Sequence, residues 1–598
     1  MAEAQDMGGS VQAHDAGPVM EAQDGYDPAK HKVSADFLGG DWKTFYDFLP
    51  DKAEPFLFST DGRKPLSFKE LKAFIIDPKN DLPGMRREDR LCLVFPNGPE
   101  LAVAYLAFAL RCTVAPLNLY LRADEFDFEY DDLPCKGLVV QKVEGLAEDE
   151  KTATTIAVAQ ARKKKIQIIL QLTPSPEIAG LFTIDKHAAG KPLTGDLLGP
   201  PLATVKREHV CLVLHTSGTT KKPKIVPITH ESMAIGGMCH AAANLLDADD
   251  VFVNTMPMFH IAGLMENLLM AAFSGAKVVA LPGQYKVKAF FDAMCRAPRG
   301  TAYSAVPAHH MSLMSLAQEK EKSDKKPFES ALRVIRNDSA ALLPSLAVQM
   351  ETFFKATVMP AYSMTEANPL CSNPRYGVRK LKSVGPTVGP DLAIIAAWPS
   401  NQLMGPGEEG EVCVRGSTVM KGYEMRPHMD KDPNEEAFTD GYMRSGDKGW
   451  IDEQGYLYLI GRFKELINRA GEKVSPFEVE DAVRKHADIE DVLCFSCPHT
   501  MLGESVGVVV VPRTGKTIKL FDLRQWLMKE KVLQDKWCPE VLVIMKELPK
   551  GATGKPARMN LAKKLGIEEQ DSRFLRGCHQ FVCLSIGLTY HTVHTAAQ

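Results

Sequence analysis

Short apolar runs alternate with helical patterns along the chain from about residue 40 onward. The apolar runs 90–97 (RLCLVFPN) and 112–118 (CTVAPLN) lie on either side of the helical pattern 98–110 (GPELAVAYLAFAL). The run 275–282 (GAKVVALP) is followed by another helical pattern and then by 300–310 (GTAYSAVPAHH). Strand and helix patterns that alternate in this way predict α/β layers with parallel strands.

Two later stretches have a different pattern. Residues 407–423 (GEEGEVCVRGSTVMKGY) and 455–462 (GYLYLIGR) combine strand-like runs with glycines, which is typical of antiparallel strands joined by tight turns. The predicted fold class is therefore α/β, and residues 40–463 are expected to form one large domain of mixed α/β type.

A second, smaller domain is predicted for residues 464–567. Its first helix is expected within 475–486 (SPFEVEDAVRKH). Ser475 would be the N-cap, Pro476 the first helical residue, and Glu478 the partner of Ser475 in a capping box. Strand-like runs and one further helical pattern follow, so this domain is expected to be a compact, mobile α+β unit.

The two ends of the chain lie outside these domains. Residues 1–39 contain EAQD twice and lack an apolar run, so they are predicted to be a disordered leader without a secretory signal. The longest apolar run, 101–110, is too short to cross a membrane and is expected to be a buried helix. Residues 568–598 form a tail without an assigned role. The chain does not end in a peroxisomal tripeptide, so the expected location is cytoplasmic, with a peroxisomal one left open.

Composition narrows the classes of function. A chain of 598 residues is too long for one compact core, and its 45% apolar and 24% charged residues are those of an ordinary globular protein. The net charge of −4 comes from interspersed signs without a basic stripe, which argues against a nucleic-acid partner. The 13 cysteines are scattered, which indicates a reducing compartment. The pair Cys494 and Cys497 lacks a second ligand pair, so we interpret it as core rather than as a zinc site.

Residues 210–214 have the pattern of a buried strand, and the hydroxyl-rich loop TSGTTKKPK (216–224) follows them. Hydroxyls and backbone N–H groups around a glycine can surround phosphate oxygens, and Lys222 and Lys224 add positive charge. The P-loop pattern G-x-x-x-x-G-K-[ST] is absent. On its own, a loop of this composition is also typical of an ordinary surface turn.

Four further stretches follow this loop in a fixed order. Together the five resemble the signatures of the adenylate-forming acyl–CoA synthetase superfamily, and the resemblance covers about residues 40–565. One such motif would be weak support, whereas five in order are specific. The other four are AYSMTEA (361–367), YMRSGDKGW (442–450), GRFKELINRAGEKVSPFEVE (461–480) and LPKGATGKPAR (548–558).

The resemblance implies a reaction in two steps. ATP and a carboxylate give an acyl-adenylate and pyrophosphate, and the acyl group then passes to the thiol of CoA. Because the first step joins two anions, catalysis must rest on charge neutralisation and positioning. The expected co-substrates are ATP and CoA. The expected metal is Mg²⁺ on Glu366, since a hard cation prefers oxygen ligands.

The resemblance also assigns the residues that bind ATP. Thr365 is expected on the α-phosphate, and Lys555 is expected to enter the site for adenylation. With Glu366 they are the expected catalytic residues. The remaining ATP contacts are expected from Tyr362 beside the adenine, from Asp447 and Arg462 on the ribose, and from Thr216, Ser217, Gly218, Thr219, Thr220 and Lys224 on the β- and γ-phosphates.

For the second step, the small domain is expected to swing about a hinge at Lys464 and to withdraw the Lys555 loop. Gly471 and Lys473 would then line the tunnel for CoA, where Gly471 leaves room because it lacks a side chain.

The acid substrate stays open. Motifs such as LHTSGTT and MPMFH resemble the subgroup that contains oxalate–CoA ligases. Two departures weaken oxalate: Asn368-Pro369 follows the TEA motif where those ligases have a His, and Arg444-Ser445-Gly446-Asp447 replaces HTGD. Medium-chain and aryl acids are therefore alternatives. The acyl pocket is expected to include His260, His309, Ser339, Ala340 and Met364.

Other members of the superfamily remain as alternatives to a CoA ligase. A luciferase-like enzyme shares these signatures, and a non-catalytic nucleotide-binding relative is the alternative that is not an enzyme. Lys221 and Ile225 replace the usual residues on the flanks of the phosphate loop, and we expect them to change its mobility without removing a phosphate donor. The sequence carries no expectation for the oligomeric state.

Overall fold

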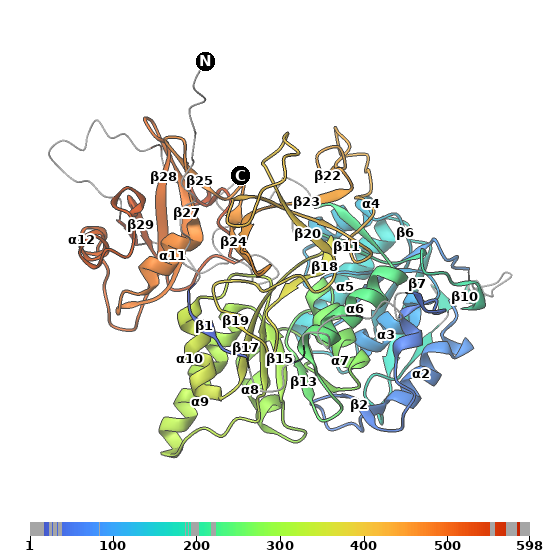
Figure 1. Ribbon diagram of the computed structural model, residues 1–598. Helices are drawn as coiled ribbons and strands as arrows, with labels where there is room; N and C mark the ends of the chain where they lie inside the picture. The colour runs from blue at the N-terminus through green and yellow to red at the C-terminus, as the bar shows by residue number, and fades with distance from the viewer. Residues whose placement is uncertain are drawn as a thin grey trace. The chain divides into compact units, whose positions relative to one another are not determined.

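The structure is a computed structural model (Figure 1). It describes residues 17–22, 27, 33, 39–82, 84–185, 187–188, 191–192, 202–216, 223–550, 556–567, 569 and 583–585. The chain forms two compact units. Within the described ranges, the first unit consists of residues 1–393, 413–444 and 452–457, and the second of residues 394–412, 445–451 and 458–598.

The first unit contains a sheet of seven described strands with a parallel centre. The five central strands run parallel, whereas the two edge strands are antiparallel to their neighbours. In sheet order the strands are β12 (Ile225–Thr229), β11 (Val210–His215), β5 (Thr113–Pro116), β4 (Arg90–Val94), β6 (Cys135–Gln141), β7 (Ile168–Pro174) and β8 (Phe182–Asp185). The helices of this region are α2 (Phe68–Ile76), α3 (Pro99–Ala109), α4 (Ala123–Asp132) and α5 (Glu148–Lys163).

Helix α3 is the buried helix that the apolar run predicts. All of its residues from Pro99 to Ala109 are buried, and it begins with a proline in the first turn, where a missing N–H costs nothing. A helix that is apolar on every side is stable only when the surrounding elements cover it completely.

A second sheet of the first unit has eight described strands and is also parallel except at its edges. Its order is β18 (Ala367–Ser372), β17 (Thr357–Met364), β16 (Val334–Asn337), β15 (Ala302–Ala305), β13 (Val251–Asn254), β14 (Lys277–Ala280), β2 (Pro55–Phe58) and β3 (Leu66–Ser67). The helices here are α6 (His230–Asn244), the π-helix η5 (Ala262–Leu269), α7 (Met270–Phe273), α8 (Val287–Cys295), α9 (Pro307–Asp324) and α10 (Pro344–Phe354).

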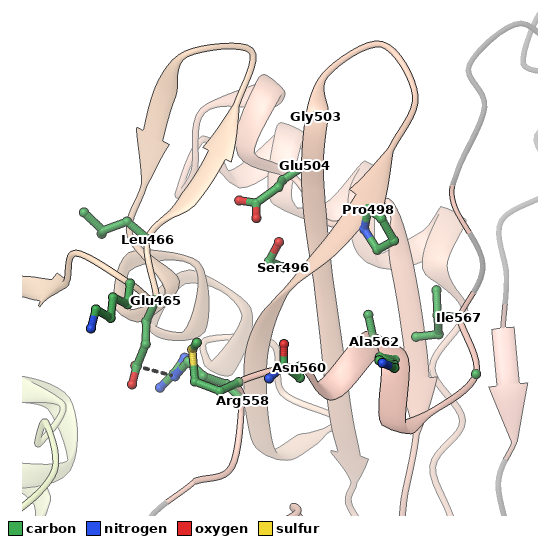
Figure 2. Close-up of a pocket in the computed structure, with 14 residues that line it drawn as sticks. Glu465, Leu466, Ser496, Pro498, Gly503, Glu504, Arg558, Asn560, Ala562 and Ile567 are labelled. Atoms are coloured by element: carbon green, nitrogen blue, oxygen red, sulfur yellow. Dashed lines mark ion pairs between the residues drawn. The ribbon is translucent and has the colours of Figure 1, made fainter. Parts of the chain in front are cut away.

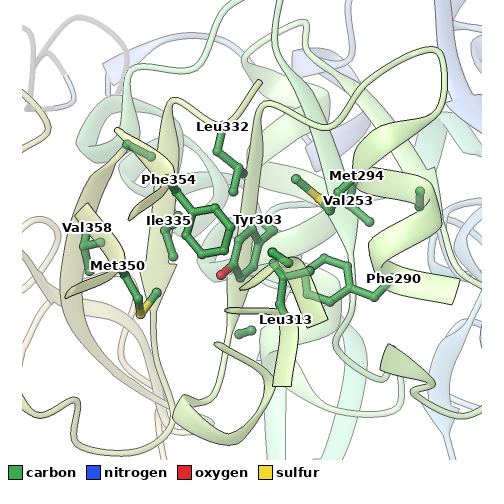
Figure 3. Packing of buried hydrophobic residues seen from close by; sticks show 14 of the residues in the cluster. Val253, Phe290, Met294, Tyr303, Leu313, Leu332, Ile335, Met350, Phe354 and Val358 are labelled. Atoms are coloured by element: carbon green, nitrogen blue, oxygen red, sulfur yellow. The ribbon is translucent and has the colours of Figure 1, made fainter. Parts of the chain in front are cut away.

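Large apolar side chains from β15, β16 and the helices α8, α9 and α10 form one core cluster (Figure 3). Tyr303 of β15 and Phe290 of α8 are completely buried and make an edge-to-face contact, with ring centroids 5.0 Å apart. Ile335 of β16 and Phe354 of α10 belong to the same cluster. Each such burial contributes about 1.5–3 kcal/mol, so this cluster holds the strand ends that carry the later site residues.

A short segment of the predicted leader is part of the fold. Strand β1 (Val19–Met20) pairs antiparallel with β19 (Arg379–Lys380), and the amide of Leu381 donates to the carbonyl of Pro18. Residues 17–22 are thus ordered by backbone hydrogen bonds, which a composition without apolar runs does not reveal. The remaining short elements are η2 (Phe45–Phe48), η3 (Pro78–Asn80), β9 (His187–Ala188), β10 (Lys191–Pro192), η4 (Leu202–Thr204) and η6 (Asp535–Trp537).

Five strands follow between residues 391 and 462. They are β20 (Asp391–Ile395), β21 (Gly410–Arg415), β22 (Phe438–Thr439), β23 (Tyr442–Ile451) and β24 (Leu457–Arg462). The chain passes from one unit to the other within β20, β21, β23 and β24. The domain boundary between residues 463 and 464 stays a prediction.

The second unit has an α+β fold. Its described strands are β26 (Glu472–Val474), β25 (Ile467–Arg469), β28 (Gly503–Pro512), β29 (Val541–Ile544) and β30 (Cys583–Ser585) in sheet order, with β27 (Ile489–His499) also paired to β28. Its helices are α11 (Pro476–Arg484), α12 (Leu520–Glu530) and α13 (Leu561–Lys564). Strand β30 belongs to the tail without an assigned role, and it adds a parallel strand beside β29.

The start of helix α11 differs from its prediction in one respect. Ser475 is the N-cap and Pro476 the first helical residue, but the Ser475 side chain makes no cap hydrogen bond. Its hydroxyl instead donates to the carbonyl of Ile460, 2.6 Å away. The predicted capping box is therefore wrong, because a tertiary contact takes the hydroxyl that would have closed it.

The predicted fold class, a mixed α/β body with a smaller α+β part, is confirmed. Among the described residues, no helix combines the length and the apolar character needed to cross a membrane. The cytoplasmic location stays a prediction.

Gly385→Ala tests the tightest backbone approach in the first unit. Gly385 has a φ of +91°, and a Cβ there would overlap the backbone of Ser372 and Asn373. Gly62 has a similar φ of +90° with no atom within 4 Å of an added Cβ, so Gly62→Ala is the matched control. We expect Gly62→Ala to cost about 1–2 kcal/mol of unfolding free energy through backbone strain alone. Gly385→Ala should cost about 3 kcal/mol more through the overlap. Urea denaturation measures both, and equal losses would contradict the close approach.

Candidate active site

The predicted phosphate loop begins and ends on a β-hairpin of the first unit. Strands β11 and β12 are antiparallel, with His215 opposite Ile225. The Thr216 amide donates to the Lys224 carbonyl at 2.9 Å, and the Lys224 amide donates to the Thr216 hydroxyl at 3.2 Å. These bonds close the base of the loop between Thr216 and Lys224. The expected phosphate contacts Ser217, Gly218, Thr219 and Thr220, and the departure Lys221, lie outside the described residues.

Ile225, the other departure on the flank of the loop, is completely buried. It packs in the core cluster beneath the seven-stranded sheet, together with Val213 of β11. The isoleucine thus anchors the second flank of the loop by apolar burial.

The structure joins two predicted site residues through a third that the sequence analysis missed. The Tyr423 hydroxyl donates to Glu366 Oε1 at 2.6 Å. The ammonium of Lys224 lies over the ring of the same tyrosine, 4.2 Å from its centroid. Tyr423 is the last residue of the stretch 407–423, whose pattern predicts only antiparallel strands. The one local sign of a further role was a tyrosine placed directly after a glycine at the end of that stretch.

Glu366 and Thr365 lie in the turn between β17 and β18. Glu366 is buried, and its backbone carbonyl accepts a hydrogen bond from the Met420 amide at 2.8 Å. Tyr362 is a buried residue of β17, two residues before the strand ends at Met364. These predicted residues are therefore neighbours because one strand and its turn carry them.

A small cavity lies beside Thr365 and Glu366, with room for about one water molecule. Apolar and hydroxyl side chains make most of its wall. The lining residues are Pro227, Ile228, Ser232, Ile261, Met265, Thr365, Glu366, Asn368, Thr418 and Met420.

The five residues predicted for the acyl pocket are all half-buried in the first unit, and none of them lines this cavity. His309 is stacked on Tyr285 with centroids 3.6 Å apart, and His260 Nδ1 accepts from the Ala262 amide at 3.3 Å. Ser339 has a φ of +66° and donates its amide to Asp338. Ala340 accepts from the Asn337 side chain through its carbonyl, and Met364 pairs with Ala367 across the β17–β18 turn.

The predicted ribose residues meet in the second unit. Arg462 Nε lies 3.1 Å from Asp447 Oδ1, and the Asp447 amide donates to the Ser445 hydroxyl at 3.0 Å. Asp447 is buried. Ser445, which stands where the family has threonine in HTGD, keeps a hydroxyl that accepts this bond within strand β23.

The predicted hinge residue Lys464 lines a pocket of about 640 Å³ in the second unit (Figure 2). Beside it, Glu465 forms an ion pair with Arg558, with 3.1 Å between Oε2 and Nε. Burial raises the pKa of Glu465, while Arg558 opposes that shift. Arg558 also pairs with Glu480 at 2.7 Å, so it ties the segment after Lys464 to helix α11. Lys555 lies outside the described residues.

Gly471 and Lys473 lie in and beside the turn of the β25–β26 hairpin. Gly471 has a φ of +89°, and an added Cβ would meet no atom within 4 Å. Its backbone conformation alone therefore favours glycine. Lys473 pairs with Asn468 across the hairpin.

Comparison with known proteins decides the family. The family model described as AMP-binding enzyme matches residues 81–424, and the model of its C-terminal domain matches residues 478–555. The chain belongs to the AMP-binding enzymes. The resemblance to the adenylate-forming acid–CoA ligases, which the five signatures predicted, is thereby confirmed.

Curated relatives and a solved structure agree with this assignment. An oxalate–CoA ligase of Arabidopsis thaliana is 34% identical over 80% of this chain and 89% of its own length. An oxalate–CoA ligase of Saccharomyces cerevisiae is 31% identical over 81% of this chain and 89% of its own length. The fold resembles that of MatB from Rhodopseudomonas palustris, solved with ATP bound. The TM-score is 0.71 and the identity 24%, over 88% of this chain and 98% of that one.

In this AMP-binding enzyme, Asn368 stands where a histidine is expected after the TEA motif, and it is part of a buried polar network. Asn368 Oδ1 lies 2.6 Å from His240 Nε2, and its Nδ2 lies 3.4 Å from Glu266 Oε1. Arg336 donates to Asp338 at 3.0 Å and lies 3.8 Å from Glu266. All five side chains are buried. Because both polar ends of the Asn368 amide have partners inside the protein, it contributes to the framework of the site.

The network has unusual protonation. Burial, followed by the nearby charge of Asp338, raises the pKa of Glu266 to about 8, although Arg336 opposes the shift. Burial likewise lowers the pKa of His240 well below its usual value. Near neutral pH, Glu266 therefore carries a proton and His240 does not. One Arg336 cation faces one Asp338 anion, which keeps the buried cluster electrically balanced.

Glu266→Gln tests this protonation. The pKa of Glu266 is about 8 when folded and 4.5 in the unfolded reference, so the unfolded chain binds fewer protons than the folded protein between these values. The stabilisation is complete below pH 4.5 and is lost as the pH rises through 8. Glutamine mimics the protonated acid, so the variant should lack this loss, up to about 1.4 kcal/mol per pH unit.

The measurement is the unfolding free energy in urea at pH 5.5 and 7.5. Glu319→Gln, at an exposed position of α9, is the matched control and should retain the wild-type pH dependence. A Glu266→Gln variant with the same pH dependence as wild type would show that Glu266 is already ionised in the folded protein.

Proposed function

We propose that this AMP-forming acid–CoA ligase acts on a small carboxylic acid, with oxalate as the first candidate. The reaction class follows the family, and the acid follows from two considerations. The curated relatives reported above are named as oxalate–CoA ligases. The cavity beside Glu366 has room for about one water molecule, less than any organic acid needs, so a compact acid requires a smaller movement of its walls than a long chain does.

The observation that carries the proposal is the contact of Tyr423 with both Glu366 and Lys224. One tyrosine thus contacts a buried carboxylate with its hydroxyl and an ammonium with the face of its ring. ATP with its metal requires both kinds of group, because the phosphates bind an ammonium and the metal binds a carboxylate.

In the first step, the chain must bring an anionic acid to the α-phosphate. Lys224 and the loop from Thr216 to Thr220 bind and orient the β- and γ-phosphates, which leave as pyrophosphate. Thr365 donates to the α-phosphate, and Lys555 supplies a cation where charge develops. Tyr362 lies beside the adenine, while Asp447 and Arg462 bind the ribose.

Mg²⁺ fits this arrangement. In the part of the chain that the structure describes, no three His, Cys, Asp or Glu side chains are grouped to hold a metal. A single buried carboxylate together with phosphate oxygens is how proteins commonly bind Mg²⁺. Glu366 would hold the metal, while the Tyr423 hydroxyl, which donates to its Oε1, would orient the carboxylate. When bound, the metal supplies charge neutralisation on the phosphates.

The acid would enter between the β17 turn and the π-helix η5, where the N-cap Ile261 and Met265 of the helix border the cavity. Among the described residues that line it, the cavity has the hydroxyls of Ser232, Thr365 and Thr418 and no cationic side chain. A second carboxylate on the substrate would therefore rely on hydrogen bonds. This makes comparison of mono- and dianions of equal size the informative test.

In the second step, the acyl-adenylate is attacked by the thiol of CoA. The hinge at Lys464 and the boundary between residues 463 and 464 belong to this proposal. The ion pair between Glu465 and Arg558 supports it, because it makes the residue after the hinge move with its own unit. Gly471 and Lys473 line the path for CoA.

ATP–pyrophosphate exchange over a panel of acids tests the substrate. The panel contains oxalate, glycolate of similar size with one carboxylate, octanoate and benzoate. We expect exchange with the two small acids at least about tenfold faster than with the larger two, a difference of about 1.4 kcal/mol in transition-state binding. Preference for octanoate or benzoate would overturn the small-acid assignment. Absence of exchange with every acid, despite measurable ATP binding, would overturn the ligase assignment.

Lys555→Ala separates the two steps. We expect adenylation, measured by pyrophosphate exchange, to fall at least about a hundredfold, because a cation is removed from the developing charge. Thioester formation from supplied acyl-adenylate and CoA should stay within a few-fold of wild type. Lys564→Ala, at an exposed position of α13, is the control and should leave both steps unchanged. Equal loss in both steps would contradict the role given to Lys555.

A further inference from the structure

A charged cluster lies directly in front of the phosphate loop. His215, the last residue of β11 and the neighbour of Thr216, is held between two carboxylates of helix α4. Its Nε2 lies 2.8 Å from Asp132 Oδ2, and its Nδ1 lies 2.5 Å from Glu129 Oε2. The side chain of Asp132 is 2% exposed, so its carboxylate contacts protein groups rather than solvent.

The second oxygen of Asp132 reaches a different segment. Oδ1 lies 3.0 Å from His428 Nδ1 and 3.4 Å from Arg426 Nε. The ring of Phe128 contacts both imidazoles, with centroids 6.2 Å from His215 and 6.0 Å from His428. One carboxylate thus connects the end of β11 to residues 426–428.

Residues 423–428, which we name the strap, also reach the other end of the phosphate loop. The Glu424 amide donates to the Ile225 carbonyl at 3.2 Å, and its carboxylate pairs with Arg90 of β4 at 2.5 Å. Tyr423 begins the strap and contacts Glu366 and Lys224. The strap therefore touches the second flank of the loop directly and the first flank through Asp132.

We propose that Asp132 is a positioning residue for ATP, which it serves by fixing His215 and the strap so that both flanks of the phosphate loop keep their place relative to Glu366. This inference rests on the proposed function, in which the loop binds the phosphates of ATP. Asp132 itself touches no substrate.

The contacts of His215 with Asp132 and Glu129 depend on pH, because His215 can lose a proton. Burial lowers the pKa of His215, but hydrogen bonds and charge from Asp132 and Glu129 outweigh it and raise the pKa to about 9. Burial opposes ionisation of Asp132, but the hydrogen bond and charge of His215 outweigh it and lower the pKa of that carboxyl. Charge from His428 and a hydrogen bond from Arg426, which face Asp132 from the strap, lower it further. An imidazolium donates from both ring nitrogens, whereas a neutral imidazole donates from one.

The direction of the effect follows from that shift. The pKa of His215 in the folded protein is above its value of 6.5 in the unfolded chain. The contacts of His215 with Asp132 and Glu129 are therefore at full strength below pH 6.5 and weaken as the pH rises through about 9. Replacing Asp132 by asparagine removes one of the two charges that hold the proton, so the weakening should move to lower pH.

Asp132→Asn tests the proposal against Asp131→Asn. Asp131 is the next acid along the helix, 63% exposed and paired with Lys164 at the surface, so it is a matched control. ATP dissociation constants are measured from pH 6 to pH 9.5 by equilibrium dialysis, together with KM for ATP and for the acid in pyrophosphate exchange. We expect Asp132→Asn to weaken ATP binding about tenfold, or 1.4 kcal/mol, at pH 8.5. The loss should be within about threefold at pH 6, where His215 is protonated in both proteins, with KM for the acid unchanged.

Glu129→Gln serves as a second variant if Asp132→Asn does not fold, and it should shift the pH profile in the same direction. The proposal is overturned if these variants bind ATP like Asp131→Asn at every pH, or if their loss is the same at pH 6 and 8.5, as a general loosening of the fold would give. ATP binding is measured without an acid. A protein that shows the expected pH shift but activates no acid would therefore refute the ligase assignment and leave the positioning role standing.

Discussion

The candidate site depends on one tyrosine that contacts both a buried carboxylate and an ammonium. The hydroxyl of Tyr423 donates to Glu366, while the face of its ring lies against the ammonium of Lys224. A phenol can do both, since its O–H donates in the ring plane and its π-face attracts a cation. In the proposed function, these two groups serve the metal and the phosphates of ATP.

The fold supplies these groups at the carboxyl ends of its strands. Thr216 follows β11 directly after its last residue His215, residues 338–340 follow β16, and Thr365 and Glu366 follow β17. Ligands of α/β proteins bind beyond this end of the sheet, because the polar turns there are free of the core packing that holds the strands. The buried cluster around Tyr303 includes residues of β16 and β17, whereas Val213 of β11 packs in the core cluster of the seven-stranded sheet.

Electrostatic balance beneath and in front of the site is a second property of the chain. Glu266 carries a proton because burial outweighs the attraction of Arg336, whereas His215 keeps its proton because two acids outweigh burial. The two groups shift in the same direction for opposite reasons. The number of charged partners and their distances decide whether each group keeps its proton, and the sequence around one residue shows neither quantity.

Local patterns in the sequence by themselves determined the alternation of strands and helices, the buried α3 run, the start of α11 and the five ordered motifs that identify the family. Each of these depends on neighbours in the chain or on short spacings. Only the tertiary structure decided that Ser475 bonds to Ile460 instead of capping its helix, that Asn368 belongs to a buried network, and that Tyr423 contacts Glu366 and Asp132 contacts His215. These contacts join residues up to hundreds of positions apart, and a hydrogen bond depends on distance in space, which sequence separation does not encode.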